Sequence, residues 1–496
     1  MEKGAERQNM TEFWKEHSQN ATVEEMMLDS NAQVLTQHEL PEILSLLPDL
    51  TDKDILELGS GIGRYTCHLI QKAHHVTAVD FMEKFVEKNR ADNSHHNNAD
   101  FIQADVTLLD FDKNSFDLIF SNWLMMYLSN EELSSLVTKI LSWLKPGGYL
   151  FFRESCFHQS GDNKRNFNPT NYRSPAIYNE IMLSAQWNES DGTKKKCFGF
   201  DMVLSKPVQT YIKMKKNQNQ VCWLLQKSPR STTQPGGFNT FQQFLDSQQY
   251  TRRGILRYEK MFGSGYVSTG GPKTTKEFVD LLNLTPGQKV LDVGCGIGGG
   301  DFYMAKNFRV EVLGMDLSSN MVDIAIERAV QEKLALVQFE VADATKRGFP
   351  ESSFDVVYSR DTILHISEKL DLFKRFHSWL KPGGKLLISD YCCGEKPWSL
   401  QFVEYVKQRG YILYTPQRYG QMLEEAGFAN VHVEDRTAQF IEVIQDELLK
   451  AEAMREEFTE EFSLEDYDAI VNGWTEKLLR CQKGDQRWGL FYATKN

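Results

Sequence analysis

Short runs of aliphatic and β-branched residues alternate along the chain with stretches in which apolar residues recur at helical spacing. SNMVDIAIERAV (319–330) is one such amphipathic stretch, and the apolar run VLGMD (312–316) comes just before it. Strand and helix patterns that alternate in this way are typical of βα units around a mostly parallel sheet. We therefore predict an α/β fold of the doubly wound, Rossmann-like kind.

The same pattern occurs twice along the chain, in the same order. ILELGSGIGRY (55–65) returns as VLDVGCGIGGG (290–300), and WLKPGGYLFF (143–152) returns as WLKPGGKLLI (379–388), so both offsets are close to 236 residues. Self-similarity at a fixed period indicates a repeated structural unit. We predict two tandem copies of one α/β domain.

A segment without apolar periodicity separates the two copies. KSPRSTTQPGG (227–237) concentrates Ser, Thr, Pro and Gly, which is typical of an exposed linker. We therefore place the first domain at residues 1–228, the linker at 229–237 and the second domain at 238–496. Each copy is longer than a minimal α/β sandwich requires, so extra helices should cover its site, most clearly after about residue 395.

A glycine-rich turn follows the first predicted strand of each copy. Glycines at alternating positions let the chain turn sharply from strand into helix and let a ligand touch the backbone. Only the second copy has the full GxGxxG spacing of a dinucleotide-binding turn. The glycines of the two turns are Gly59, Gly61 and Gly63 in the first copy and Gly294, Gly296, Gly298, Gly299 and Gly300 in the second.

Acidic residues end the next two predicted strands of each copy. Asp80 and Asp316 end the second strand, and Asp105 and Asp343 end the third. A carboxylate at the end of the second strand can accept two hydrogen bonds from a ribose diol, which suits nicotinamide and adenosine cofactors alike. The alternatives are a nicotinamide enzyme, or ordinary loop glycines and N-cap acids in a protein without a cofactor.

The complete series of elements distinguishes between these alternatives. A strand, a glycine turn, two acids and a KPGG turn after a helix occur in order in both copies. This series resembles that of the class I S-adenosylmethionine-dependent methyltransferases. The resemblance implies that S-adenosylmethionine is the cofactor and that the second acid meets its adenine amine.

Composition and charge narrow the range of partners. A formal net charge of −12 opposes nonspecific binding to nucleic acid or anionic lipid. The N-terminus has no apolar core of signal-peptide length, and no apolar run approaches the roughly 18 residues of a membrane span. The eight cysteines include no CxxC pair, and the histidine doublets lack metal-ligand spacing. We expect a cytosolic monomer with reduced thiols, small-molecule substrates and no metal.

Two nonapeptides with the same layout differ at their polar positions. YSRDTILHI (358–366) contains Asp361 and His365, and FSNWLMMYL has Trp123 and Tyr127 in the same places. His365 lies just past a strand, at the carboxyl edge where α/β sites form, and can act there as a general base. Asp361 could attract a cationic nitrogen or contact the cofactor. The alternative for His365 is a helix-start histidine that is hydrogen-bonded to a backbone carbonyl.

Longer motifs are spread over the whole chain. They are FWKEHS, RESCFHQSGDNKRNFNPTNYR (153–173), KKNQNQVCW (215–223), YTRRGILRYEKMFGSGYVSTGG (250–271), EYVKQRGY (404–411) and QRWGLF (486–491). These motifs resemble the tandem-domain, plant-type phosphoethanolamine N-methyltransferases, which convert phosphoethanolamine to phosphocholine by three methylations. The resemblance implies an enzyme of this kind that feeds phosphatidylcholine synthesis.

In the second domain the resemblance implies that Tyr250 and His365 form a catalytic pair. The implied phosphobase contacts are Tyr391, Tyr405, Arg409, Tyr411 and Lys477. Basic side chains neutralise a phosphate, tyrosine hydroxyls donate to it, and aromatic faces favour a methylated cation. The alternatives are a solvated helix end for Arg409 and a surface lysine for Lys477. The implied cofactor contacts are Tyr258, Ser268, Gly294, Asp316, Asp343, Ala344 and Arg360.

In the first domain the resemblance implies an equivalent set of contacts. The implied cofactor residues are Gly59, Arg64, Asp80, Asp105, Val106 and Asn122. The implied phosphobase residues are Ser155, Ser160, Gly161, Arg165 and Tyr172. Their segment mixes hydroxyls, glycine and basic side chains as an anion-binding loop does, and a polar surface excursion is the alternative.

The two copies agree in their cofactor residues and differ in their acceptor residues, since Tyr391 corresponds to Ser155 and His365 to Tyr127. The resemblance implies that the first domain methylates phosphoethanolamine once and that the second domain performs the next two methylations. The alternatives are a free amine such as glycine or ethanolamine as acceptor, a sterol, and a first domain that binds the cofactor without turnover.

Overall fold

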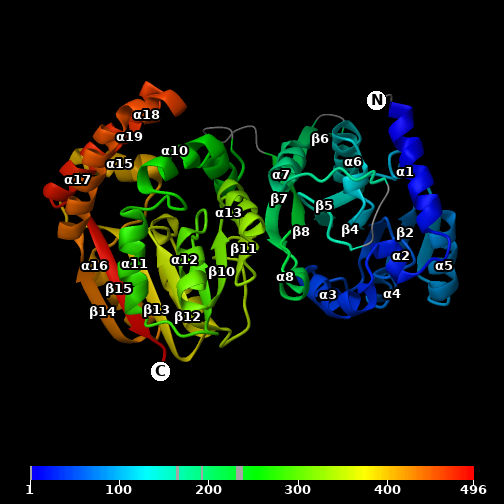
Figure 1. Ribbon diagram of the computed structural model, residues 1–496, viewed down its shortest axis with the longest axis horizontal. Helices are drawn as coiled ribbons and strands as arrows, with labels where there is room; N and C mark the ends of the chain where they lie inside the picture. The colour runs from blue at the N-terminus through cyan, green and yellow to red at the C-terminus, as the bar shows by residue number, and fades with distance from the viewer. Residues whose placement is uncertain (1–2, 163–166, 192–193, 231–237) are drawn as a thin grey trace. The chain divides into compact units, whose positions relative to one another are not determined.

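The chain folds into two compact units, each of which contains one copy of the repeat (Figure 1). The computed structural model describes residues 3–162, 167–191, 194–230 and 238–496. One unit comprises Met1–Gln243 with Ala329–Ala335, and the other comprises Phe244–Arg328 with Leu336–Asn496.

The first unit is built on a mixed sheet with the strand order β7-β8-β5-β4-β1-β2-β3. Strands β1 to β5 pair in parallel, whereas β8 pairs antiparallel with β5 and β7, and β6 with β7. The strands are β1 (Asp54–Leu58), β2 (His75–Asp80), β3 (Ala99–Gln103), β4 (Phe116–Asn122), β5 (Leu144–Ser155), β6 (Gln186–Asp191), β7 (Lys194–Pro207) and β8 (Gln220–Arg230). The helices are α1 (Lys3–His17), α2 (Val23–Met27), α3 (Ala32–Leu46), α4 (Thr66–Leu69), α5 (Glu83–Asn93), η1 (Met125–Tyr127), α6 (Asn130–Trp143), α7 (Pro175–Ser184) and α8 (Gln209–Lys215).

The second unit repeats this sheet in the order β14-β15-β13-β12-β9-β10-β11. Its strands are β9 (Lys289–Val293), β10 (Glu311–Asp316), β11 (Val337–Val341), β12 (Phe354–Arg360), β13 (Leu380–Cys393), β14 (Ala429–Asp435) and β15 (Gln486–Thr494). Its first helices are α9 (Phe241–Phe244), η2 (Leu245–Gln249), α10 (Arg252–Phe262), α11 (Gly271–Leu281), α12 (Gly299–Phe308), α13 (Ser319–Glu332) and η3 (Ile363–His365). The later helices are α14 (Lys369–Trp379), α15 (Leu400–Arg409), α16 (Pro416–Glu425), α17 (Thr437–Ala453), α18 (Arg455–Glu461) and α19 (Leu464–Gln482).

The equal strand orders confirm the predicted fold, a duplicated α/β domain with a parallel core. The last strand of each unit pairs antiparallel with a long strand: β8 pairs with β5 in the first unit, and β15 pairs with β13 in the second. The central parallel strands are almost wholly buried, and every residue of β9 after Lys289 is buried. A parallel strand covered on both faces carries mostly apolar side chains, which explains the continuous aliphatic runs of the sequence.

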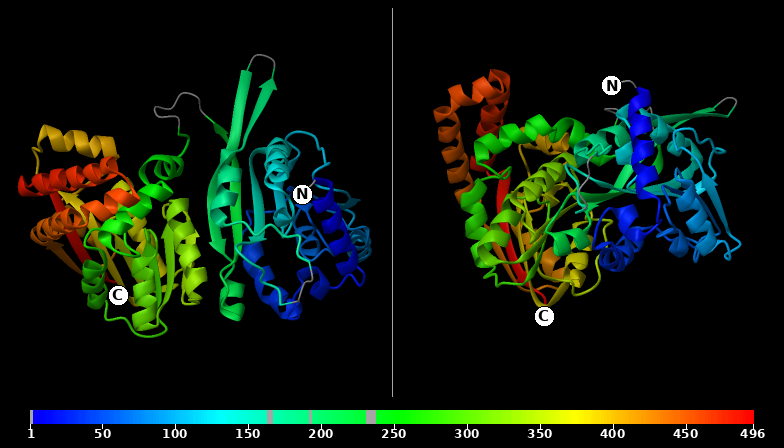
Figure 2. Two further views of the ribbon diagram at one scale, coloured as in Figure 1. Left: turned by 45° about the horizontal axis from the view of Figure 1, so that its top comes forward. Right: turned by 45° about the vertical axis from the view of Figure 1, so that its right-hand side comes forward.

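The two units differ in what surrounds the sheet. The segment after residue 395 forms helices α15 to α19, and α17 packs against α19 and α10. Figure 1 shows α10, α15, α17, α18 and α19 gathered at one end of the second sheet, as expected for capping helices. In the first unit the β6–β7 hairpin projects away from the sheet (Figure 2). Strand β8 also extends two residues into the predicted linker, of which residues 231–237 lie outside the described residues.

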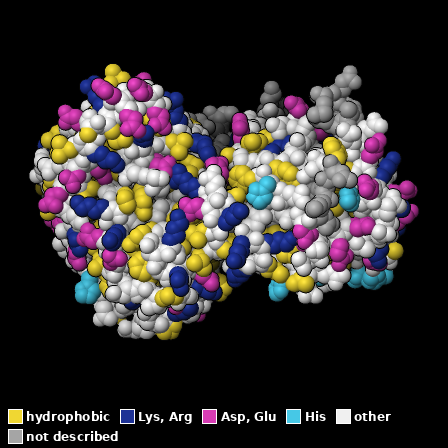
Figure 3. Space-filling model, viewed as in Figure 1, with side chains coloured by type: hydrophobic (Ala, Val, Ile, Leu, Met, Phe, Trp, Pro, Cys, Tyr) yellow, Lys and Arg dark blue, Asp and Glu magenta, His cyan; other side chains and the backbone are white. Residues whose placement is uncertain are grey.

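Acidic and basic side chains are interspersed over the visible face of each unit (Figure 3). Among the described residues, no helix is both long and apolar enough to cross a bilayer. The same residues contain no group of three or more His, Cys, Asp or Glu side chains with the geometry of a metal site. All eight cysteines are free.

The turn after β9 depends on a glycine. Gly294 has a φ of +88°, and a Cβ placed on it would collide with Oγ1 of Thr362 in the turn after β12. Gly383 has a similar φ of +75°, but a Cβ there would meet nothing within 4 Å. The two positions therefore share the same backbone strain and differ only in crowding.

We predict that Gly294→Ala destabilises the second unit more than Gly383→Ala. Each alanine must adopt the left-handed conformation, at a cost of about 1–2 kcal/mol. Only Gly294→Ala must also displace the turn that carries Thr362, so its thermal transition should fall by several degrees more, as measured by scanning calorimetry. If the transition temperature fell by the same amount in both variants, the close approach of Gly294 to Thr362 would not contribute to stability.

Two candidate active sites

A cavity opens at the carboxyl ends of β1, β2 and β4 in the first unit. Side chains from helix α1 and from the segment around α2 complete its wall. Every described residue that the sequence analysis assigned to this domain lines the cavity: Gly59, Arg64, Asp80, Asp105, Val106, Asn122, Ser155, Ser160, Gly161 and Tyr172. Arg165 lies outside the described residues. The predicted cofactor and phosphobase residues of the first domain thus meet at one place.

Asp80 is fixed by the glycine turn that precedes it in the chain. Its two carboxylate oxygens accept hydrogen bonds from the backbone N–H groups of Gly61 and Met82, each at 2.8 Å. Burial raises the pKa of Asp80 to about 6, although these hydrogen bonds act in the opposite direction. The remaining lone pairs can accept hydrogen bonds from a diol. Asp105 accepts from the backbone N–H and the hydroxyl of Thr107 at 2.9 and 2.7 Å.

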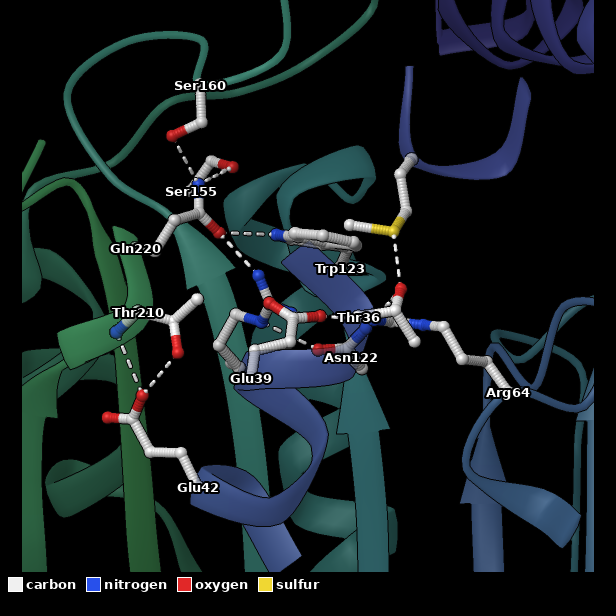
Figure 4. A network of polar contacts seen from close by, with 12 residues as sticks. Thr36, Glu39, Glu42, Arg64, Asn122, Trp123, Ser155, Ser160, Thr210 and Gln220 are labelled. Carbon is white, nitrogen blue, oxygen red and sulfur yellow. Dashed lines mark hydrogen bonds and ion pairs between the residues drawn. The ribbon is translucent and has the colours of Figure 1, made fainter. Parts of the chain in front are cut away.

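A buried network of charged side chains lies beside the cavity (Figure 4). Glu39 of α3 accepts hydrogen bonds from Arg153 of β5 at 2.9 Å and also pairs with Arg64. All three side chains are almost inaccessible to solvent. Burial opposes the charge of Glu39, but the two guanidinium groups hold the pKa of this carboxyl below its ordinary value. The sequence analysis missed Glu39, because its partner Arg153 is 114 positions away.

Arg64 has donors that the protein leaves unused. Its Nη1 atom contacts Glu39 and Thr36, whereas Nε and Nη2 are buried without a hydrogen-bond partner among the described residues. A guanidinium with two free donors at a cavity wall fits a ligand carboxylate. An amino-acid cofactor with a carboxylate would satisfy this requirement.

The predicted phosphobase loop is held by β8. The amide nitrogen of Gln220 donates to the hydroxyls of Ser155 and Ser160 at 2.6 and 2.7 Å. A side chain at Gly161 would collide with the backbone carbonyl of Leu28, so only glycine allows this approach of the loop to the segment after α2. The hydroxyl of Tyr172 accepts a hydrogen bond from Asn168 at 2.9 Å.

The second unit builds the same cofactor geometry. Asp316 accepts hydrogen bonds from the backbone N–H groups of Gly296 and Ser318, each at 2.9 Å, and burial raises its pKa to about 6. Asp343 accepts from the hydroxyl of Thr345 at 2.6 Å. Ala344 follows in the same turn. The two acids therefore occupy equivalent places in the two units.

The guanidinium of Arg360, which was predicted to contact the cofactor, is hydrogen-bonded to the segment that follows Ser268. It donates to the hydroxyls of Thr274 and Thr275 and to the carbonyl of Thr269, at 2.6 to 2.9 Å. Its Nε is buried without a hydrogen-bond partner among the described residues. The ring of Tyr258 packs on that of Phe262, at 6.2 Å between centroids.

The predicted acceptor residues of the second unit form one aromatic and basic cluster. The ring of Tyr411 lies 5.0 Å from that of His365, 5.7 Å from Tyr405 and 6.4 Å from Tyr391, between centroids. Lys477 donates to the hydroxyl of Tyr391 at 3.0 Å. Lys477 is therefore not a surface lysine, in contrast to the alternative considered from the sequence.

Two further predicted residues border this cluster. The guanidinium of Arg409 lies 5.9 Å from the ring centroid of Tyr405. Tyr250 is partly buried, and desolvation, with the nearby Asp316 and Tyr391, raises its pKa.

The imidazole of His365 is neutral near pH 7. Burial, with the positive charges of Lys369 and Arg409, lowers the pKa of His365 to about 4. A neutral imidazole has a lone pair available to accept a proton. His365 is the last residue of η3, in the segment after β12, and its ring lies beside that of Tyr411 in the acceptor cluster.

Other residues of this site were not assigned from the sequence. Trp488 of β15 donates its indole N–H to Asp361 at 2.9 Å, across 127 positions of the chain. The guanidinium of Arg480 lies 3.7 Å from the ring centroid of Tyr405. QRWGLF, which contains Trp488, was among the matching motifs, but no local pattern indicates which residue its indole contacts.

Two stretches of the chain match family models for a methyltransferase domain. They are residues 55–148 in the first unit and residues 291–388 in the second. Each match spans the glycine turn, both acids and the start of the strand that carries Ser155 or Tyr391. The matched residues therefore include the predicted glycine turns and acids of both units and end before Ser155 and Tyr391.

Similar proteins extend over the whole chain. Phosphoethanolamine N-methyltransferase 3 of Arabidopsis thaliana is 54% identical over 99% of both chains. Phosphoethanolamine N-methyltransferase 1 of Zea mays is 55% identical over 99% of this chain and 96% of the plant protein.

A solved structure matches both units of the chain. Phosphoethanolamine N-methyltransferase 2 of Haemonchus contortus, in complex with phosphomonomethylethanolamine and S-adenosylhomocysteine, superposes with a TM-score of 0.74 and 27% identity. The match covers 93% of this chain and 99% of the nematode protein. Since relatives that are more than half identical span nearly its full length, the chain belongs to the phosphoethanolamine N-methyltransferase family.

Proposed function

We propose that the protein transfers methyl groups from S-adenosylmethionine to the nitrogen of phosphoethanolamine, one at a time, and forms phosphocholine. The observation that carries this proposal is the acceptor cluster of the second unit. Two cationic side chains, Arg409 and Lys477, and three tyrosines form one cluster there with a neutral histidine, which contacts Tyr411. Such a site suits a small molecule with a phosphate at one end and an amine at the other.

The cofactor would be held at equivalent places in both units. Asp80 and Asp316 would accept hydrogen bonds from its ribose, and the glycine turns would face its amino-acid part. The free donors of Arg64 would bind its carboxylate in the first unit. The cofactor, when bound, supplies a methyl group that is bonded to a positively charged sulfur. Transfer of this methyl group leaves a neutral thioether, and the loss of the sulfonium charge provides the driving force.

In the second unit the chain's residues bind the phosphate, orient the amine and remove its proton. The nitrogen lone pair must be free before it can bond to the methyl carbon, and His365 takes the proton that blocks it. Arg409 depresses the pKa of His365 in the protein alone. A phosphate bound at Arg409 offsets that charge, which raises the pKa of His365 and makes the imidazole a stronger base.

The domains would divide the three methylations. The first unit has Trp123 and Tyr127 where the second has Asp361 and His365. Its polar loop with Ser155 and Ser160 would bind phosphoethanolamine for the first methylation. The second unit would accept the monomethyl product for the next two. An acceptor without an anion is less well supported, because Arg409 and Lys477 would then have no negative charge on the acceptor to bind.

We also propose that the enzyme works as a monomer in the cytosol. All eight cysteines are free thiols, which fits a reducing compartment. Light scattering on the protein as it elutes from a size-exclusion column would measure its mass and so test whether it is a monomer.

His365→Ala should stall the reaction at the monomethyl product. Loss of a general base typically costs about 10²–10⁴-fold in rate, and here it should affect only the second and third methylations. Mass spectrometry of the products from phosphoethanolamine resolves the intermediates. His432→Ala, an exposed histidine on β14, is the matched control and should behave as wild type. Full conversion to phosphocholine by His365→Ala would contradict the assigned role.

Cofactor binding should weaken in mild acid. Asp80 and Asp316 both have a pKa raised to about 6, and the ribose diol needs their carboxylate form. Affinity should therefore be constant above about pH 7 and fall by about tenfold per pH unit below about pH 6. Titration calorimetry with S-adenosylhomocysteine between about pH 5 and 8 measures this, and Asp80→Asn and Asp316→Asn assign each site. An affinity that is unchanged at about pH 5 would mean that neither acid contacts the ribose.

A further inference from the structure

Each acceptor site has a layer of three side chains at the ends of neighbouring strands. The first comes from the turn after β4 or β12, the second from β5 or β13, and the third from the antiparallel strand β8 or β15. Ser155 lies opposite Gln220 in the first unit, and Tyr391 lies opposite Trp488 in the second. Gln220 and Trp488 thus occupy the same position in the two sheets.

The first member of the layer is held in a strained conformation in both units. Trp123 has a φ of +57° and Asp361 a φ of +50°, which is uncommon for any residue with a side chain and especially for a bulky one. Their N–H groups donate to the carbonyls of Arg153 and Ser389 at 2.8 and 2.7 Å. A turn that retains this strain with two unrelated side chains indicates a constraint from the site.

Both layers contain an indole hydrogen bond, but its donor and acceptor have exchanged strands. In the first unit the indole of Trp123 donates to the side-chain oxygen of Gln220 at 2.6 Å. In the second unit the indole of Trp488 donates to the carboxylate of Asp361 at 2.9 Å. As a result, the turn after β4 carries an indole in the first unit, and the equivalent turn after β12 carries a carboxylate in the second unit.

In the first unit the hydrogen bonds determine the orientation of the Gln220 amide (Figure 4). Its oxygen accepts from Trp123 and, at 2.8 Å, from Arg153, so a flipped amide would turn its own N–H groups toward two donors. The amide nitrogen must then donate to Ser155 and Ser160. Ser160 contacts the side-chain oxygen of Asn219, which takes its hydrogen. The hydrogen of Ser155 has no recorded acceptor among the described residues and is available to an anion.

In the second unit the hydrogen bonds orient the Asp361 carboxylate. One oxygen accepts from Trp488 and from Ser389, at 2.9 and 3.2 Å. The other oxygen is buried and has no hydrogen-bond partner among the described residues. A buried carboxylate oxygen without a partner is costly and is suited to a cationic ligand. Each methylation replaces an N–H group of the acceptor nitrogen with a methyl group. A carboxylate attracts the positive charge of that nitrogen whether or not N–H groups remain, so it suits successive methylations.

We propose that Gln220 and Trp488 are positioning residues that adapt the two sites to different acceptors. Gln220 directs the hydroxyl of Ser155 toward the acceptor phosphate in the first unit. Trp488 directs the free oxygen of Asp361 toward the cationic nitrogen in the second. This inference rests on the proposed function and adds to it the origin of the acceptor preference of each domain.

The first test uses Gln220→Glu in the full chain. Glutamate retains acceptors for Trp123 and Arg153 but removes the donor and places an anion beside the hydroxyls. The KM for phosphoethanolamine should rise by about tenfold or more, with little change in kcat, because a hydrogen bond to a charged group is lost. Conversion of the monomethyl acceptor and the affinity for S-adenosylhomocysteine should stay as in wild type, and they serve as internal controls for folding.

The reciprocal test uses Trp488→Phe. Phenylalanine retains the ring that packs on Phe440, at 5.0 Å between centroids, and lacks the N–H that orients Asp361. The KM for the monomethyl acceptor should rise by about threefold to tenfold, as expected for one lost hydrogen bond, while the first methylation is unaffected.

A double-mutant cycle shows whether Gln220 acts through Ser155. Ser155→Ala alone should raise the same KM, and Gln220→Glu should then add less than it does in the wild-type background. Additive effects, a change in both domains from either variant, or loss of S-adenosylhomocysteine binding in Gln220→Glu would overturn the inference. If the wild type does not methylate phosphoethanolamine at all, the proposed function itself fails.

Discussion

Parallel strand pairing aligns the carboxyl ends of β1, β2 and β4 in the first unit, and of β9, β10 and β12 in the second. Every one of these strands must end in a turn at the same edge of its sheet, because the chain returns through a helix. The glycine turns, Asp80 and Asp316, and the strained turns that carry Trp123 and Asp361 all lie at this edge. The chemistry of both sites depends on this alignment.

The parts of the sites that were predicted from the residues themselves are local in sequence. Asp80 receives its hydrogen bonds from residues 19 and 2 positions away, so the glycine turn and the acid form one readable pattern. Hydrophobic periodicity likewise predicted the βα units and the duplication. The tyrosines and cations of the acceptor cluster were identified only through resemblance to a family, since they come from β13, α15, the segment after α15, and α19.

The parts that were missed depend on pairing between distant segments. The partner of Glu39 is 114 positions away and that of Asp361 is 127 positions away. The register of β15 decides that Trp488 meets Asp361, and a shift of one residue would turn the indole to the other face of the sheet. Sequence patterns constrain that register only weakly. The last two residues of β8 also fall within the predicted linker, because they are as polar as a linker.

The buried charges of the first unit are better explained by binding than by stability. Burying two guanidinium groups and one carboxylate costs more than a well-packed apolar cluster of the same size. Glu39 neutralises one positive charge, so the network retains an excess positive charge next to the cavity. Two donor atoms of Arg64 also have no hydrogen-bond partner in the part of the chain that the structure describes. A ligand carboxylate would supply the missing negative charge and both acceptors, and this accounts for an arrangement that the apoprotein alone does not favour.

Duplication produced two sites that share one half and differ in the other, and the fold explains why. The proposed cofactor half consists of backbone N–H groups and acids in the turns after neighbouring parallel strands, so neither copy can change it without disturbing those turns. The acceptor half is completed by the antiparallel strand, whose side chains can be exchanged while the backbone ladder is retained. Gln220 and Trp488 show such an exchange at one position of the ladder. A duplicated fold of this kind can therefore keep one methyl donor and acquire separate acceptors for successive steps.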